Sequence, residues 1–408
     1  MNKLLQLISL PTEGLGWMRR ALGLWCAANC LIRLPEAAFY LSDLGVLSRS
    51  QYFTTLKGTY AFSFYLVSGQ PWVVYALLLL TAGLGFLQLL GKDRRLTRGL
   101  LWVLMLSLQN RNPALLDASD DLIRLLLFWD MFLPSGRAGP AKDIVTPATV
   151  GLQVQLTACL LFRGLQTTAE PFWMSVQWET SDLAPLYFGV LSYERLLLWL
   201  LAVVVWLRPA RIPMLLLAVP ILAARASLLH PLFPLTLAVA LTSLVYVPKR
   251  EKRFEVLWST SPFKKATATC GLLVVSLLTL ALNAFPVGAV VAAGQGLGLY
   301  QDWSQVYPVP SDRLVQLAAL DQSTGQMFWS ITSESGRRAR LYADKVGKNE
   351  AWASILPKAL ALRNGQVKGP ITLWMRTAPL HGEFTLGSAK LKLLSDTPVH
   401  LRTEGNAL

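Results

Sequence analysis

Several ionisable side chains stand at the ends of long apolar runs, where they could hold a charged ligand and act on it. They are Arg111, Asp121, Arg163, Arg225 and His230. Arginine binds carboxylate and phosphate groups through its N–H donors, and histidine exchanges a proton readily near neutral pH. An ionisable group at bilayer depth costs free energy unless it is paired or hydrated, so each is a candidate site residue. We therefore predict that the first four bind a ligand and that His230 is the catalytic group.

Each of these residues also has a purely structural interpretation. Asp120 and Asp121 begin a helix, where carboxylates stabilise the positive end of the helix dipole. Asp120 can pair with Arg124, four residues further on the same face. The polar stripe from Arg163 to Glu170 also fits a helix end that emerges into water, and a lone histidine most often packs or ends a helix. We favour structure for each residue taken singly and a site for the group.

Long apolar runs must position these residues. Of the 408 residues, 53% are hydrophobic and 15% are charged, whereas a soluble domain carries about a quarter charged residues. The run Val73–Leu90 holds no charge and is long enough to cross a bilayer. The sequence thus predicts an all-α polytopic membrane bundle of about nine transmembrane helices. The expected spans are Leu15–Tyr40, Pro71–Leu90, Thr97–Gln109, Asp121–Leu133, Pro147–Leu165, Tyr193–Leu207, Ile212–Leu229, Leu232–Val247 and Thr267–Phe285.

The basic residues fix the expected orientation. Four clusters of Lys and Arg precede the first span or follow the second, sixth and eighth, so that all four lie on one face. The positive-inside rule makes that face cytoplasmic. We expect a multi-pass protein of the cell inner membrane, with its N-terminus inside and the tail from about Pro286 in the periplasm. Most of the candidate site residues then lie near the outer face, which predicts a polar cavity that opens outward.

The remaining composition excludes other classes of function. The net charge of +14 is accounted for by these loops, so we expect the lipid bilayer and not nucleic acid as the partner. Cys26 and Cys30 share a helix face but have no histidine or further cysteine near them in sequence, so we expect no metal site. The aromatic segments Leu41–Gln70 and Pro171–Val190 are expected to lie at the outer interface as interfacial or re-entrant helices.

The chain divides into a transmembrane domain over residues 1–290 and a tail over residues 300–408. Alternating apolar residues predict strands at Leu314–Leu320 and Ile371–Met375, with a further strand at Ala389–Leu394. The segment Tyr342–Arg363 is expected to be helical. We therefore expect a small α+β extracytoplasmic domain, and we find no catalytic triad or phosphate-binding loop in its sequence.

Several short motifs carry a resemblance to a known family. They are Ser42–Gly45, Ser107–Pro113, Asp120–Leu122 running into Leu127–Trp129 and Phe132–Pro134, Leu161–Leu165 through Trp173, and Gln301–Trp303 through Pro308–Pro310. In these motifs, over about residues 15–310, the chain resembles bacterial HTTM-domain proteins, which are membrane relatives of the vitamin K-dependent γ-glutamyl carboxylase. The resemblance implies a nine-helix bundle whose active cavity faces the periplasm, with a quinone as the cofactor.

The chain departs from the carboxylases at one important place. In those enzymes a lysine just after the fifth-span motif is the key catalytic group, whereas the matching place here holds Gln166 or Thr167. Neither side chain can act as an amine base, although His230 does match a histidine of the family. We therefore expect a related reaction on a lipid, quinone or exported peptide. The alternative is a non-enzymatic maturation, immunity or assembly factor whose tail binds an exported peptide, and the sequence leaves open whether the protein is an enzyme.

Overall fold

The computed structural model of the chain describes residues 9–55, 62–92, 94–116, 118–134, 142–166, 194–207, 211–213, 216, 218, 232–244, 253–256, 313–321, 327–331, 371–379 and 390–395. These residues belong to two compact units, which are considered separately below. Unit 1 comprises Met1–Asn29, Thr81–Leu106 and Asp117–Tyr307, and unit 2 comprises Cys30–Leu80, Ser107–Leu116 and Pro308–Leu408.

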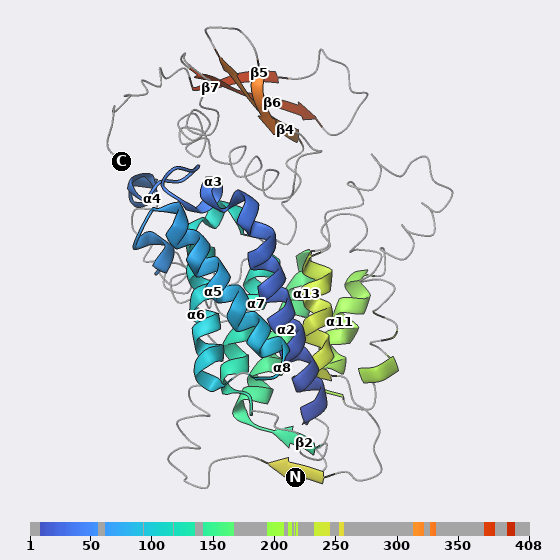
Figure 1. Cartoon of the computed structure of the whole chain (residues 1–408). Helices are drawn as coiled ribbons and strands as arrows, with labels where there is room; N and C mark the ends of the chain where they lie inside the picture. Colours follow the sequence, from blue (N-terminus) through green and yellow to red (C-terminus); the bar gives the residue numbers. More distant parts are fainter. Residues whose placement is uncertain are drawn as a thin grey trace. The chain divides into compact units, whose positions relative to one another are not determined.

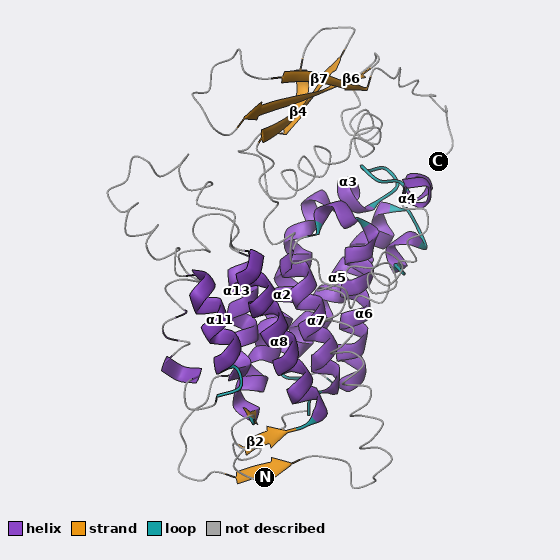
Figure 2. Ribbon diagram, turned by 180° about the vertical axis from the view of Figure 1, so that it is seen from behind, coloured by secondary structure: helices purple, strands orange, loops and turns teal. Residues whose placement is uncertain are grey.

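The described part of the chain is mainly helical (Figure 1, Figure 2). Its helices are α2 (Thr12–Arg33), α3 (Ala37–Leu41), α4 (Arg49–Thr55), α5 (Pro71–Leu89), α6 (Arg95–Arg111), α7 (Ala118–Phe132), α8 (Pro147–Gln166), α11 (Glu194–Val204) and α13 (Leu232–Leu241). Short 3-10 turns occupy Leu34–Glu36, Phe64–Leu66, Pro113–Leu115 and Thr242–Leu244. Within unit 1, α8 packs against α7 and α11, and α13 packs against α7.

Local sequence explains where these helices begin and end. At the start of α8, the Thr149 amide donates to the Thr146 hydroxyl (3.1 Å) and the Thr146 amide donates to the Thr149 hydroxyl (2.8 Å). This reciprocal capping box satisfies two N–H groups that a helix otherwise leaves unpaired, and Pro147 at the next position is already set for a helix. At the end of α5, Gly91 has a φ of +68°. Its left-handed conformation lets the amides of Gly91 and Lys92 bond back to the last turn, which terminates the helix.

Helices occur at the first six expected spans, the first of which contains both α2 and α3. A helix also occurs at the start of the eighth expected span, where α13 begins. Most of the seventh span and all of the ninth lie outside the described residues. Among the residues that the structure describes, Pro71–Leu89 is the one helix both long and apolar enough to cross a membrane, and Pro147–Leu161 and Leu235–Leu244 are shorter apolar helices. The helical fold is therefore observed, while the number of membrane crossings and their orientation stay predictions.

Charge and apolar surface are distributed unusually in this fold. Arg98, Arg111 and Asp130 are almost completely buried, whereas Trp72 and Phe86 on α5 are exposed. In water-soluble proteins Arg and Asp are almost never fully buried unless they are paired, and large apolar side chains collect inside. The interior here holds much of the charge, and many large apolar side chains face outward.

Helices α2 and α5 approach each other closely through glycine. A Cβ at Gly23 would lie 2.6 Å from the Gly85 carbonyl oxygen, and a Cβ at Gly85 would lie 2.7 Å from that of Gly23. No side chain fits at either position, so the two backbones meet directly. By contrast, a Cβ at Gly83, also on α5, would meet nothing within 4 Å.

A small sheet in unit 1 was not predicted from the sequence. Strand β1 (Leu10–Pro11) pairs antiparallel with β2 (Lys142–Val145), and β2 pairs parallel with β3 (Arg253–Val256). The sheet joins the N-terminal segment to the loop before α8 and to the segment after α13. Each strand is too short to carry a readable alternation, which is why sequence pattern did not reveal it.

The tail contains a four-stranded antiparallel sheet in the order β5-β4-β6-β7. Strands β4 (Arg313–Asp321), β6 (Ile371–Pro379) and β7 (Lys390–Ser395) coincide with the three predicted strands, which are therefore confirmed. Strand β5 (Met327–Ile331) was not predicted. The expected helix Tyr342–Arg363 lies outside the described residues.

Candidate anion-binding site

The structure describes some of the predicted site residues and not others. Arg111 is the last residue of α6, in unit 2, and Asp121 lies in the first turn of α7, in unit 1. Arg163 belongs to α8, but its side chain is not among those described. Arg225 and His230 lie outside the described residues. The expected meeting of these last three side chains stays a prediction.

Asp121 forms a local ion pair. Its Oδ1 accepts a hydrogen bond of 2.6 Å from Nη2 of Arg124, three residues further along α7, and both side chains are largely buried. This pair neutralises two charges at the start of the helix, where the carboxylate also stabilises the positive end of the helix dipole. Its geometry fits the structural interpretation of Asp121.

Arg111 has a different environment. Its side chain has no exposed surface, and its Nη2 donates to the backbone carbonyl oxygens of Leu47 (2.7 Å) and Ser42 (3.3 Å). The same nitrogen lies 3.7 Å from Oδ1 of Asp43. Within the described part of the chain, Nε and Nη1 have no hydrogen-bond partner. Because these two nitrogens carry N–H donors that are shielded from water, the guanidinium retains unused capacity to bind an anion.

The turn that follows α6 holds Arg111 in position through its neighbours. Asn112 donates through Nδ2 to the Tyr40 carbonyl oxygen (3.0 Å), and Asn110 donates likewise to the Phe62 carbonyl oxygen (2.9 Å). One turn earlier in α6, the Ser107 hydroxyl accepts a hydrogen bond of 2.6 Å from the Phe64 amide. The segment Ser107–Asn112 is thus attached to the chain between residues 40 and 64. Two of the motifs that carry the family resemblance, around Asp43 and around Arg111, meet here.

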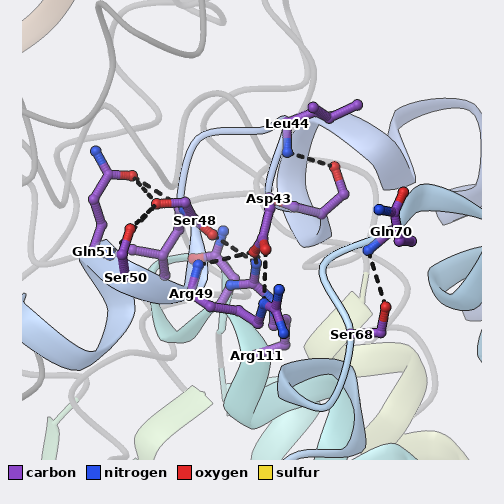
Figure 3. Close-up of polar contacts among 12 residues, drawn as sticks. Asp43, Leu44, Ser48, Arg49, Ser50, Gln51, Ser68, Gln70 and Arg111 are labelled. Carbon is purple, nitrogen blue, oxygen red and sulfur yellow. Dashed lines mark hydrogen bonds and ion pairs between the residues drawn. The ribbon is translucent and has the colours of Figure 1, made fainter. Parts of the chain in front are cut away.

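Asp43 lies beside two arginines (Figure 3). Its carboxylate accepts hydrogen bonds from the Arg49 backbone amide (2.9 Å) and from Arg49 Nε (2.7 Å), and Nη2 of Arg111 approaches the same Oδ1 that accepts from the Arg49 amide. A glycine is needed at position 69, because a Cβ there would overlap the Asp43 carboxylate. The Gly69 carbonyl oxygen also accepts a hydrogen bond of 3.0 Å from the Asp43 amide. Sequence reasoning missed Asp43 and Arg49; the signal was the Ser42–Gly45 motif, which was used only for the resemblance.

Tyr52, on α4, adds a second buried polar group. Its side chain is 2% exposed, and its hydroxyl has no hydrogen-bond partner within the described part of the chain. Burial raises the pKa of Tyr52, and the nearby charge of Arg111 partly opposes this shift. The phenol is therefore neutral at physiological pH and can donate a hydrogen bond.

The electrostatics of the cluster favour an anion. Arg111 lies just beyond the expected third span, and burial lowers its pKa to about 10, with Asp43 and Tyr52 acting in the opposite direction and Arg49 in the same one. Arg111 is thus still charged at neutral pH, although burial disfavours its charge. Two arginines and one aspartate leave this cluster, hereafter the Arg111 cluster (Asp43, Arg49, Tyr52 and Arg111), with a net positive charge. Its charge and its guanidinium donors allow it to hold an anion.

A second buried cluster lies in unit 1, where it joins α2, α5, α6 and α7. Asp130 Oδ1 is 2.9 Å from Nε of Arg19 and 3.7 Å from Nη1 of Arg98, and Asp130 Oδ2 accepts a hydrogen bond of 3.1 Å from Gln88 Nε2. Arg98 Nη1 also donates to the Asp130 carbonyl oxygen at 2.7 Å. Arg19 and Arg98 belong to the basic clusters that predicted the orientation, and no ion pair was predicted for them. Their hydrogen bonds to neighbouring helices indicate that this cluster holds the bundle together.

The chain matches no protein-family model, and comparisons with curated proteins and with solved structures likewise return no match. The resemblance to HTTM-domain proteins therefore stays a prediction, as do the cavity and the quinone that it implies.

Proposed function

We propose that this chain is a multi-pass inner-membrane protein, with its N-terminus inside and its tail outside, that binds an anionic ligand on its extracytoplasmic side. The Arg111 cluster is the proposed binding site. One observation carries the proposal: the fully buried Arg111 has two guanidinium nitrogens that find no hydrogen-bond partner among the residues that the structure describes. A buried donor that stays unsatisfied costs about 1–3 kcal/mol, and more when it is charged, so a bound anion offsets that cost.

The distribution of charge supports the membrane location. Buried arginines and aspartates occur here together with exposed Trp, Phe and Leu, a combination that is uncommon in a soluble protein. A bilayer would account for it, because lipid chains solvate the apolar side chains while polar groups must pair within the protein. The apolar helix α5, which is long enough to cross a bilayer, agrees with this location.

Contacts between loops support the proposed grouping of the loops on two faces. The small sheet of unit 1 joins residues 10–11, 142–145 and 253–256, all of which the proposed topology places inside. Arg211, also expected inside, donates through Nη1 to the Ser9 carbonyl oxygen at 2.6 Å. In unit 2, Arg111 and Asn112 bond to the segment 40–47, and both segments are expected outside. Loops separated by a hydrocarbon layer of about 30 Å cannot bond to one another, and each of these contacts joins loops assigned to one face.

The function we propose is recognition of a lipid, a quinone-derived anion or an exported peptide through its anionic group. Asp121, Arg163 and Arg225 stay predicted ligand-binding residues and His230 a predicted proton carrier, but they belong to unit 1, and the proposal for the Arg111 cluster in unit 2 does not depend on them. The Arg111 cluster itself supplies binding and orientation, since arginine stays protonated and cannot accept a proton at neutral pH.

Native mass spectrometry of the detergent-purified protein tests this proposal. We expect an anionic adduct that survives purification of the wild type and is lost from Arg111→Gln, with partial retention in Arg111→Lys because the charge remains. Arg20→Gln is the matched control, since Arg20 is exposed and stacks on Trp17 at 5.5 Å. Equal adduct occupancy in wild type and Arg111→Gln would contradict the proposal.

The orientation has its own test. A cysteine introduced at Ser50, which is exposed on α4, is expected to react with a membrane-impermeant maleimide added outside spheroplasts, and one at Lys92 only after lysis. The described native cysteines Cys26, Cys30 and Cys159 are buried and give little background. Labelling of Lys92→Cys from outside would reverse the proposed topology.

The tail sheet offers one observation in favour of the alternative function, the binding of an exported peptide. Among the described strands, β5 and β7 form the two edges of the four-stranded sheet. An extended peptide can add to a sheet edge through main-chain hydrogen bonds. A peptide adduct in native mass spectra that is lost on removal of residues 308–408, and not on Arg111→Gln, would identify this second function.

A further inference from the structure

We propose that the ligand of the Arg111 cluster is the single carboxylate of a long-chain amphiphile that lies in the outer leaflet. This inference rests on the proposed function and deepens it, because it names the chemical class of the anion. Three features of unit 2 lead to it, namely the net charge of the cluster, its hydrogen-bond donors and the apolar side chains beside it.

The charge of the cluster matches a monoanion. Arg49 and Arg111 contribute two positive charges, and Asp43 neutralises one of them through a 2.7 Å contact with Arg49 and a 3.7 Å contact with Arg111. One positive charge is left, and it lies at the buried end of the cluster. A carboxylate neutralises it completely, whereas a dianionic phosphate monoester would bring an excess negative charge beside the Asp43 carboxylate. Two neighbouring negative charges in a partly buried site repel each other strongly.

The donors of the cluster match a small planar acceptor. Nε of Arg111 carries one N–H and Nη1 carries two, and none of them has an acceptor within the described residues. The Tyr52 hydroxyl, which interacts electrostatically with Arg111, is buried and also lacks a partner. A carboxylate has two oxygens and can accept from the guanidinium with one and from the phenol with the other. A single ligand group of this kind satisfies both buried side chains.

Exposed apolar side chains adjoin the residues of the cluster and their hydrogen-bond partners along the chain. Leu44 follows Asp43 and Phe53 follows Tyr52, while the Phe62 carbonyl oxygen accepts from Asn110 and the Val67 carbonyl oxygen accepts from Arg49. These apolar side chains are each more than half exposed. The proposed topology puts this segment at the outer membrane interface, where an amphiphile has its head group at the depth of the cluster and its chain against apolar side chains. A free small carboxylate gains nothing from these side chains.

The exposed end of the cluster gives the ligand its route. The side chains of Asp43 and Arg49 are 30% and 39% exposed, whereas that of Arg111 is fully buried. The ligand therefore reaches Arg111 past the Asp43–Arg49 pair. Both Arg49 and Tyr52 lie on the short helix α4, which therefore carries one exposed and one buried partner of the proposed ligand.

Titration of the full-length protein in a nonionic detergent tests the inference. The probes are oleate, oleyl alcohol, acetate and oleyl phosphate in alkaline buffer, and the measurement is the ligand-dependent shift in Tm. We expect oleate to stabilise the wild type, oleyl alcohol and acetate to have no effect at the same concentration, and oleyl phosphate to bind more weakly than oleate. Stabilisation by acetate equal to that by oleate would overturn the inference that the ligand is an amphiphile. Tighter binding of oleyl phosphate than of oleate would overturn the inference that its anionic group is a carboxylate.

Tyr52→Phe is the decisive variant because it removes one oxygen atom and keeps the buried ring. Its hydroxyl has no hydrogen-bond partner in the described part of the chain, so the variant is expected to keep or raise the Tm without ligand while its oleate affinity falls about tenfold. Tyr75→Phe on α5 removes the same atom from another tyrosine and is expected to bind oleate like the wild type. Unchanged oleate affinity in Tyr52→Phe would refute the inference. An Arg111-dependent adduct that carries no carboxylate would also refute it, but would leave the proposed function standing.

Discussion

Replacement of Asp130 by asparagine is expected to destabilise the helical bundle strongly. The carboxylate of Asp130 has no exposed surface and lies between Arg19 at 2.9 Å and Arg98 at 3.7 Å. Asparagine keeps the size of the side chain but removes the negative charge. The two guanidinium groups, which are 7% and 0% exposed, then stay buried without that carboxylate.

The magnitude follows from this burial. Two unit charges about 4 Å apart interact by about 4 kcal/mol at the effective dielectric constant that fits most protein sites. Removal of one partner from a buried ion pair costs about 3–5 kcal/mol, because the remaining charge is poorly solvated. We expect the destabilisation by Asp130→Asn to fall in this range. The amide oxygen still accepts a hydrogen bond, which lowers the cost, whereas the loss of one carboxylate affects two arginines, which raises it.

The assay is reversible unfolding of the full-length protein in mixed micelles of dodecyl maltoside and SDS, followed by tryptophan fluorescence. Arg20→Met is the control, since Arg20 is exposed and adjacent to Arg19, and it should cost less than about 1 kcal/mol. The double variant Arg98→Met with Asp130→Asn should recover part of the loss, because one unpaired cation is removed with its partner. A loss below about 1 kcal/mol for Asp130→Asn would refute the argument that this charge holds the helices together.

The other predictions concern close packing and the Arg111 cluster. Gly23→Ala on α2 should cost about 1–3 kcal/mol of stability, because its Cβ meets the backbone of α5. Gly83→Ala on α5, where a Cβ meets none of the described atoms within 4 Å, should stabilise by up to about 1 kcal/mol. Equilibrium unfolding of the two variants measures both changes. Gly69→Ala should displace the Asp43 carboxylate and change the ligand affinity more than the stability. Equal ligand affinities of the variant and the wild type would contradict this expectation. Affinity for the anion should fall as pH rises through about 10, because the lowered pKa of Arg111 means that its guanidinium loses its proton there. The unfolded chain keeps that proton to a higher pH, so the lowered pKa of Arg111 costs stability while both states are protonated, and this cost is relieved as pH rises above about 10.

The positions of the helices were largely readable from the sequence. Apolar runs at 71–90 and 147–165 predicted α5 and α8 to within a residue or two at each end. The reason is local: a run of apolar residues bounded by Pro147 at one end, or by Gly91 at the other, specifies a helix and its limits without reference to the rest of the chain. The alternation in the tail predicted β4, β6 and β7 for the same reason.

The composition of the candidate site was only partly readable. Arg111 was found because a cation at the end of an apolar run stands out by itself. Asp43, Arg49 and Tyr52 come from the aromatic segment Leu41–Gln70, where only Asp43 lies in one of the short motifs and nothing local shows that these side chains meet Arg111. Their role depends on the return of the chain after more than sixty residues, which brings Ser42 and Leu47 onto the Arg111 guanidinium.

Burial is what only the tertiary structure decided. The sequence placed Arg19 and Arg98 beside apolar runs as orientation signals, yet both are buried against Asp130 from another helix. Contacts between segments distant in sequence decide whether a charged side chain faces water or a charged partner. The contribution of that charge to stability depends on which of the two it faces, because the Coulomb interaction grows as water is excluded. The sequence by itself determined which residues are charged and which segments are helical, and the packing of those helices determined which charges are paired and which donors of Arg111 are left for a ligand.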